Sequence, residues 1–281
     1  MNSKGAGILY VVSTPIGNMK DITLRALEVL EEVDLIAAED TRHSRKLLSK
    51  YGIKKRLMSY YGAREEVKGE EVLRELREGK KVALISDAGT PGISDPGYYL
   101  IREAADEGHR ILTIPGPSAL ISAITISGLP TSRFVFEGFL PPKGSARKKR
   151  IDSLRREERA VVIYESPRRA LKTLGELLEA LGDREVVMAR ELTKIHEELV
   201  RGRISVIIKT LEEKGVRGEI TLVIAGETEP EEGEDKAALM DELIREALDG
   251  GMPVKDAADA IAARLGLSRR DVYQSILKAR G

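Results

Sequence analysis

Several charged side chains stand directly after apolar segments that have the length and composition of β-strands. The string EDTR, residues 39–42, follows one such segment, and Lys194 and Glu197 follow another. In an open parallel sheet, ligands bind at the carboxyl ends of the strands, so these side chains are predicted to lie at one functional edge. Carboxylates and a desolvated lysine can accept a proton during a reaction. Asp40, Lys194 and Glu197 are therefore our candidate catalytic residues.

Each candidate also has a purely structural interpretation. Asp40 or Thr41 could cap the following helix, with Arg42 paired nearby, and Lys194 and Glu197 could form a solvated face of ion pairs. A lysine serves as a base only when burial or positive charge lowers its pKa, whereas neighbouring carboxylates raise it. A carboxylate is therefore the better candidate for the base, and Lys194 is the better candidate for an anchor of phosphate or substrate.

Three turns rich in glycine and proline follow other strand-like segments. They are residues 13–18 (STPIGN), 86–97 (SDAGTPGISDPG) and 115–120 (PGPSAL). The second holds three glycines and two prolines, which excludes a helix or a central strand. Glycine lets backbone approach a ligand closely, and the third turn leads into a helix whose first amides could receive an anion. The three turns together predict a small-molecule site, although Asp87 could instead stabilise its own turn.

Several familiar ligand signatures are missing. The G-x-G-x-x-G pattern of dinucleotide sites is absent, because Gly5 and Gly7 lie before the first strand, and no Walker loop is present. The three histidines, His43, His109 and His196, have no metal-ligand spacing, and the chain has no cysteine. We therefore expect neither NAD nor ATP, and no metal site.

These strings resemble those of the 16S rRNA cytidine 2′-O-methyltransferases, which belong to the tetrapyrrole-methylase superfamily. The similarity is carried by residues 8–23, 36–42, 85–97, 114–119, 164–169 and 189–197. It extends over roughly residues 7–226 and is followed by a helical tail similar to that of the family. The resemblance implies an enzyme that binds S-adenosylmethionine (SAM) in a cleft between two α/β domains, forms a homodimer and methylates small-subunit ribosomal RNA.

The resemblance also assigns residues around the cofactor. Matching the motifs gives Ile16, Asp87, Thr90, Ser118 and Ala119 from the first domain and Glu165, Ile220 and Thr221 from the second. Two strings depart from the superfamily pattern: Ser86-Asp87-Ala88 stands where Gly-Asp-Pro is usual, and residues 14–17 replace a glycine-rich loop. Both departures favour the RNA branch over porphyrin chemistry.

The periodicity of the chain is typical of an α/β fold. Apolar segments at 8–13, 35–38, 81–86 and 110–114 alternate with amphipathic helices, which predicts a mainly parallel sheet with helices on both faces. A second α/β pattern has strands at 160–165, 185–190 and 219–225. Between them, residues 127–144 contain all three phenylalanines and are predicted to form an extended crossover.

Four regions follow from this pattern. We expect an α/β domain at 1–126, a second at 127–226, an acidic linker at 227–236 and a helical domain at 237–281. The linker prediction rests on the string ETEPEEGED, whose composition is typical of exposed segments.

Two local basic regions are candidate RNA surfaces. Residues 143–159 hold eight basic side chains against three acidic ones, and residues 254–280 have the pattern of a helix-turn-helix around Gly266. An ordinary charged helix face and a helical dimer clamp are the respective structural alternatives. The candidate substrate-binding residues are Arg42, Lys148, Lys149, Arg150, Arg269 and Arg270.

The composition excludes other classes of protein. The 46 basic and 46 acidic residues balance, so any RNA binding must be local. No run of about eighteen apolar residues predicts a membrane span, and the start lacks the blocks of a signal peptide, so we expect a cytoplasmic protein. Two alternatives stay open: a tetrapyrrole C-methyltransferase, against which the basic regions count, and a non-catalytic RNA-binding protein of the same fold.

Overall fold

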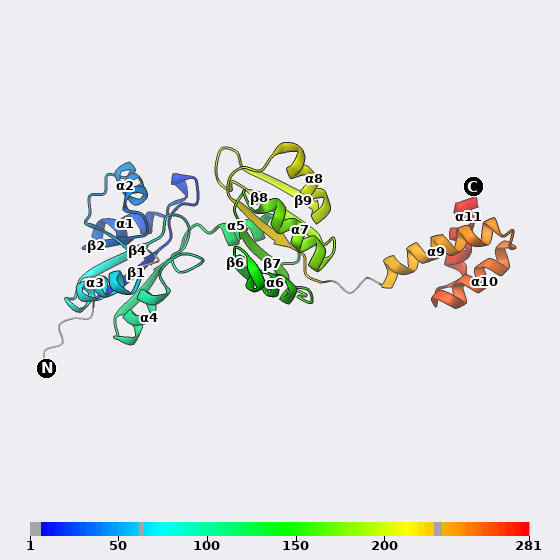
Figure 1. The fold of residues 1–281 in the computed structure, drawn as a ribbon, viewed down its shortest axis with the longest axis horizontal. Helices are drawn as coiled ribbons and strands as arrows, with labels where there is room; N and C mark the ends of the chain where they lie inside the picture. The colour runs from blue at the N-terminus through cyan, green and yellow to red at the C-terminus, as the bar shows by residue number, and fades with distance from the viewer. Residues whose placement is uncertain (1–6, 62–64, 228–231, 281) are drawn as a thin grey trace. The chain divides into compact units, whose positions relative to one another are not determined.

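The computed structural model describes residues 7–61, 65–227 and 232–280. The chain divides into two compact units, Met1–Glu227 and Thr228–Gly281. The first unit contains two five-stranded sheets with their helices, which we call the first and second lobes, and the described part of the second unit is helical (Figure 1).

The sheet of the first lobe is parallel throughout, with the order β3-β2-β4-β1-β5. Its strands are β1 Ile8–Val12, β2 Leu35–Ala38, β3 Leu57–Ser59, β4 Lys81–Ile85 and β5 Arg110–Ile114. The inner strands are buried on both faces, which explains why their sequences are apolar without alternation. The prediction of a mainly parallel sheet is confirmed for this lobe.

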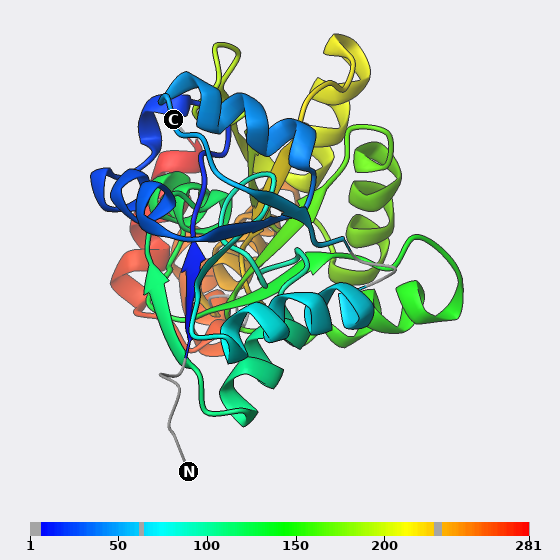
Figure 2. The ribbon, with the colours of Figure 1, turned by 90° about the vertical axis from the view of Figure 1, so that its left-hand side faces the viewer.

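Helices cover both faces of this sheet. Helices α1 (Leu24–Glu32) and α2 (Thr41–Lys50) pack on one face, and α3 (Glu65–Arg77) and α4 (Tyr98–Asp106) pack on the other (Figure 2). Because the strands are parallel, their carboxyl ends lie at one edge of the sheet, where ligands bind in folds of this kind.

The sheet of the second lobe is mixed, with the order β6-β7-β10-β8-β9. Strand β6 is parallel to β7, and the other neighbours are antiparallel. The strands are β6 Phe134–Phe139, β7 Ala160–Glu165, β8 Glu185–Arg190, β9 Glu198–Arg203 and β10 Ile220–Ile224. The segment predicted as an extended crossover thus contributes an edge strand, and β9 is an edge strand that the pattern did not predict.

Helices also cover this second sheet. Helices α6 (Gly144–Ser153), α7 (Ala170–Leu181) and α8 (Ile204–Lys214) pack on one face, and α5 (Ala119–Ser127) packs on the other. The second lobe therefore begins before the expected boundary at residue 126. Because α5 is apolar around most of its circumference, its sequence did not indicate which sheet it would cover.

The second unit has its own hydrophobic core. It consists of α9 Glu232–Asp249, α10 Val254–Leu265 and α11 Arg269–Arg280. Gly266 adopts a left-handed conformation (φ 64°) and ends α10, at the turn that the sequence predicts. Helix α9 begins inside the expected linker 227–236, because glutamate is a good helix former and composition alone does not locate a helix start. None of the described helices has the length and apolarity required to cross a bilayer.

Candidate functional site

A cavity of about 290 Å³ lies between the two lobes, at the carboxyl ends of β1, β4 and β5. We call it the interlobe pocket. The first lobe contributes the turns after these strands, and the second contributes the end of β7, the start of β10 and part of the β8–β9 connection. The pocket therefore lies where the strand-end rule places a ligand.

Most of the cofactor residues assigned by motif matching lie on the wall of this pocket. They are Ile16, Thr90, Ser118, Ala119, Glu165, Ile220 and Thr221. The three glycine- and proline-rich turns meet here because their strands are parallel and end at one edge. The side chain of Ser118 also caps α5, by accepting a hydrogen bond from the backbone N–H of Ile121.

Asp87 does not line the interlobe pocket. Its carboxylate accepts a hydrogen bond from the backbone N–H of Asp40 (3.0 Å), and its own N–H donates to Glu39 (3.2 Å). Asp87 thus ties together the turns after β2 and β4. Asp95, eight positions further along the same turn, lies on the pocket wall instead.

Asp95 is a carboxyl group that motif matching missed. Burial, followed by the negative charges of Glu39 and Asp87, raises the pKa of Asp95 to about 6. Burial also raises the pKa of Glu39. An aspartate before Pro-Gly in a ligand-binding turn was the only signal in the sequence, and it is shared with ordinary turns.

The catalytic candidate Asp40 is the N-cap of α2. Its side chain accepts from the N–H of Arg42 (2.8 Å) and forms an ion pair with the Arg42 guanidinium (2.7 Å). The hydrogen bonds from Arg42 hold the pKa of Asp40 far below its usual value. Asp40 lies near the pocket but not on its wall, and the structural interpretation accounts for all these contacts.

The other two catalytic candidates lie in the loop that joins β8 to β9. Lys194 Nζ contacts carboxylate oxygens of Glu191 (2.9 Å) and Glu219 (3.0 Å), and Glu219 lines the pocket. Partial burial opposes the charge of Lys194, but these hydrogen bonds outweigh it and raise its pKa. The carboxylate of Glu197 accepts from the backbone N–H of Thr193.

This loop also closes against the first lobe. The N–H of Asn18 donates to the hydroxyl of Thr193 (3.0 Å), and a Cβ added to Gly17 would come within 2.5 Å of the Lys194 side chain. A glycine at position 17 is therefore needed for the two lobes to approach here. The contact borders the interlobe pocket through Ile16 and Leu192.

Backbone strain is concentrated in the loops around the pocket. Among the residues that the structure describes, the non-glycine residues with positive φ are Ser94 (62°), Glu191 (51°) and Thr193 (66°). Ser94 lies on the pocket wall, and the other two belong to the β8–β9 loop. Because such conformations are unfavourable unless the surroundings impose them, they often mark functional loops.

Glu165 is held in the pocket wall by a full set of partners. Its carboxylate accepts hydrogen bonds from Arg169 Nε (2.7 Å), the N–H of Ser166 (2.7 Å) and the hydroxyl of Thr173 (2.6 Å). Burial opposes the charge, but these bonds lower the pKa of Glu165. Glu165 is therefore a fixed anion that shapes the pocket.

These contacts continue to the basic helix α6. Thr173 accepts a hydrogen bond from Arg147 Nη2 (2.7 Å), and Arg147 Nε donates to Glu176 (2.6 Å). Arg147 is only 3% exposed, so its guanidinium serves the interior rather than the surface. We call Glu165, Thr173, Arg147 and Glu176 the buried polar chain. It connects the pocket wall with α6.

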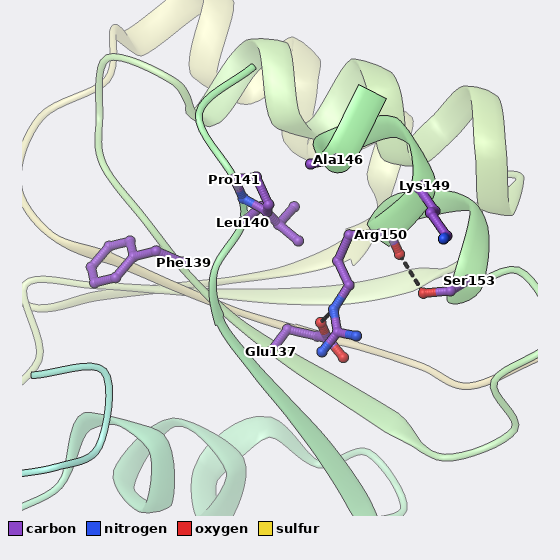
Figure 3. Close-up of a pocket in the computed structure, with 8 residues that line it drawn as sticks. All are labelled: Glu137, Phe139, Leu140, Pro141, Ala146, Lys149, Arg150 and Ser153. Carbon is purple, nitrogen blue, oxygen red and sulfur yellow. Dashed lines mark hydrogen bonds and ion pairs between the residues drawn. The ribbon is translucent and has the colours of Figure 1, made fainter. Parts of the chain in front are cut away.

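The candidate substrate residues are all exposed. Lys148, Lys149 and Arg150 lie on α6, where Arg150 pairs with Glu137 (Figure 3). Arg42 pairs with Asp40 at the start of α2. In the second unit, Arg269 pairs with Asp259 (2.5 Å), and Arg270 lies beside it at the start of α11.

Comparisons with known proteins give consistent results for the sequence and the fold. A family model described as tetrapyrrole (corrin/porphyrin) methylases matches residues 8–207, and one described as the RsmI C-terminal HTH domain matches residues 234–280. A protein of Thermotoga maritima named ribosomal RNA small subunit methyltransferase I is 53% identical over 220 residues, which cover 78% of this chain and 99% of that protein.

A protein of the same name from Escherichia coli O157:H7 is 42% identical over 283 residues, which cover 100% of this chain and 97% of that protein. Among solved structures, the cobalt precorrin-4 methyltransferase CbiF superposes with a TM-score of 0.59 at 18% identity, covering 80% of this chain and 97% of that one. A diphthine synthase has the same TM-score at 16% identity, covering 78% and 89%. At such low identity the structural likeness concerns the fold.

Proposed function

The chain belongs to the tetrapyrrole methylase family, within which it is a ribosomal RNA methyltransferase, and we propose that it uses SAM to methylate the 2′-hydroxyl of one cytidine in 16S rRNA. The observation that carries this proposal is the similarity to small-subunit rRNA methyltransferases over both units of the chain. The interlobe pocket, at the ligand-binding edge of the first sheet, is where we propose that the methyl donor binds.

The residues of the pocket suit SAM in chemistry. Its volume of about 290 Å³ lies just below the range of roughly 300–1,000 Å³ for small-molecule sites. Ile16, Leu192 and Ile220 offer apolar walls, and the carboxylates of Asp95 and Glu219 add negative charge to the lining, which suits a cationic ligand.

SAM supplies a methyl group on a sulfonium, which is a good leaving group. The protein therefore contributes mainly alignment, and holding two reactants in line can lower a barrier by roughly 7–11 kcal/mol. The close contact between Gly17 and the β8–β9 loop joins the two lobes beside the pocket. The fixed Glu165 keeps the pocket wall in one arrangement.

A ribose 2′-hydroxyl must lose its proton as it attacks. We assign this proton to the Asp95 carboxylate, because Asp95 lines the pocket and its pKa of about 6 leaves it ionised but basic at neutral pH. Glu197 and Asp40 are weaker candidates, since their carboxylates already bind Thr193 and Arg42. Lys194 positions Glu219 and is available as an anchor for the substrate.

RNA contacts are proposed at the exposed cations. Lys148, Lys149 and Arg150 on α6, together with Arg42, would bind phosphates near the pocket, and Arg269 and Arg270 would do so from the second unit. We further propose a homodimer that acts in the cytoplasm on the small subunit or its RNA. A tetrapyrrole substrate is not favoured, because the relatives that match along the whole chain are named for ribosomal RNA.

The deciding experiment is incubation with labelled SAM and small subunits that lack the modification, followed by mass mapping of the RNA. A single labelled cytidine with a methylated ribose is expected. Label on a tetrapyrrole but not on RNA would refute the proposal. SAM binding without transfer to free rRNA or to assembled subunits would favour a non-catalytic RNA-binding protein.

A further inference from the structure

Phe139 is an aromatic side chain that the chain leaves in solvent. It ends β6, and 56% of it is exposed. Its ring lies 5.7 Å from the ring of Tyr164, and both residues line the interlobe pocket. A single exposed apolar side chain is common on protein surfaces, but Phe139 lies beside a second aromatic ring on the wall of a ligand-sized cavity, where a planar ligand group can stack on it.

The backbone just before Phe139 departs from regular strand geometry. The pairing of β6 with β7 shifts register between Phe136 and Gly138, so that β6 has one extra residue there, as in a β-bulge. Gly138 has a φ of 61°, and a Cβ there would come within 2.6 Å of the Ser94 hydroxyl. The glycine thus lets β6 pass close to the strained turn of the first lobe, and bulges of this kind re-aim the following side chain.

Cations lie on the other side of the same short segment. A second cavity of about 480 Å³ borders Phe139 and is also lined by Lys149 and Arg150 of α6. Figure 3 shows Phe139 pointing away from these two side chains, with Leu140 and Pro141 between them. A strand of RNA crossing Leu140 and Pro141 would therefore meet an aromatic face, then the Lys149 ammonium group and the Arg150 guanidinium, which pairs with Glu137.

We propose that Phe139 stacks an unpaired base of the RNA substrate at the mouth of the interlobe pocket, while Lys149 and Arg150 bind phosphates of the same strand. This inference rests on the proposed function and defines the form of its substrate. A nucleotide that enters the pocket leaves its neighbours, and stacking on an aromatic ring compensates for the lost stacking. The partner is thus single-stranded RNA, or a nucleotide unstacked from a loop.

The absence of tryptophan from the chain gives a direct test. Phe139→Trp introduces a single tryptophan, whose emission we expect to be quenched when a short single-stranded oligoribonucleotide is added. Val206→Trp is the control, because Val206 is 51% exposed on α8 and lines neither cavity. Its emission should stay constant. The same RNA in a duplex should quench Phe139→Trp less.

Kinetics supply the second measurement. Phe139→Ala should raise the KM for RNA about tenfold, a change expected for the loss of one stacked base, with SAM affinity within about twofold. Phe139→Tyr should restore the KM, because tyrosine keeps the aromatic face. Thermal denaturation of each variant confirms that the fold is intact.

Three results would overturn the proposal. One is constant emission of Phe139→Trp at RNA concentrations that fluorescence polarisation shows to be saturating. Another is a decrease in the SAM affinity of Phe139→Ala as large as the increase in its KM for RNA, which would make Phe139 part of the cofactor site. The last is a change of oligomeric state in Phe139→Ala with normal RNA binding, which would assign the ring to a second copy of the chain. If the wild-type protein binds no RNA by polarisation, the proposed function fails as well.

Discussion

At the scale of single residues, Asp95 shows how neighbouring loops set the proton affinity of a carboxyl group. Its pKa of about 6 arises from burial and from Glu39 and Asp87. If Asp95 takes the proton, the single-turnover rate of the wild type should rise with pH and level off above about 6. Asp95→Asn should lower that rate by ~10²–10⁴ and remove this dependence. Rates are compared at saturating SAM, and a near-normal rate in Asp95→Asn would exclude the assignment.

The same residue predicts a pH-dependent change in stability. The folded-state pKa lies above the usual value of 3.8, so Asp95 stabilises the fold in its protonated form and loses this contribution as the pH rises through about 6. Asparagine mimics the protonated form. Asp95→Asn should therefore melt at a higher temperature than the wild type at about pH 8, and the difference should be much smaller at about pH 4, close to the unfolded pKa of 3.8. An equal shift at both pH values would show that charge is not the cause.

Seven of the eight cofactor residues that motif matching predicted line the pocket, whereas Asp87 does not and Asp95 of the same turn does. Strand and helix periods indicate where a side chain points, whereas an irregular turn of glycines and prolines has no period. The family resemblance supplied Ile220 and Thr221, and they start a strand that the sequence pattern also predicts. The direction of Asp87, toward the N–H of Asp40, depends on a contact between two separate turns. Sequence patterns do not contain that contact.

At the scale of elements, the buried polar chain fixes α6 relative to the pocket wall. Thr173→Val removes the hydroxyl between Glu165 and Arg147 and leaves buried polar groups unsatisfied. We expect a loss of ~1–3 kcal/mol in the free energy of unfolding and a higher KM for RNA, because α6 is no longer held. Thr173→Ser keeps the hydroxyl and should retain both properties better. Equal effects of valine and serine on the KM would show that the hydroxyl does not position α6.

The strands that the sequence did not predict lie at sheet edges. Strand β3 has three residues, and β9 carries two arginines and a glycine in six residues. Edge strands have one free side and weak apolar patterns, so local sequence indicates them poorly. The inner strands were predicted because burial on both faces demands continuous apolar residues. Helix α5 was predicted as a helix, but the sheet it covers is chosen by tertiary packing.

At the scale of the whole molecule, each of the two units has its own hydrophobic core. The match with the Thermotoga maritima relative covers 99% of that protein but 78% of this chain. The relative is therefore about a fifth shorter than this chain. This length agrees with the first unit, Met1–Glu227. The catalytic unit should therefore fold without Thr228–Gly281.

Truncation after Glu227 tests this division. SAM affinity and the melting temperature of the first unit should stay near wild-type values, because the interlobe pocket lies entirely within it. RNA affinity should fall by ~10-fold or more, since the basic residues of α11 would no longer act together with α6. Calorimetry and filter binding measure the two quantities. Unchanged RNA affinity would show that the second unit does not bind RNA. A truncated protein that fails to fold would show that the first unit is not independent of the second.

Ser94 on the pocket wall and Thr193 in the β8–β9 loop have left-handed backbone, and we expect this strain to lower heat resistance while it serves activity. Glycine or asparagine adopts this conformation more easily, and each replacement would relieve strain of about 1 kcal/mol. A gene library screened only for protein that survives heating should therefore enrich glycine or asparagine at these positions. A library screened for methylated ribosomes should keep the parental residues. Positions at which the two screens disagree would outline the active rim without any knowledge of the substrate.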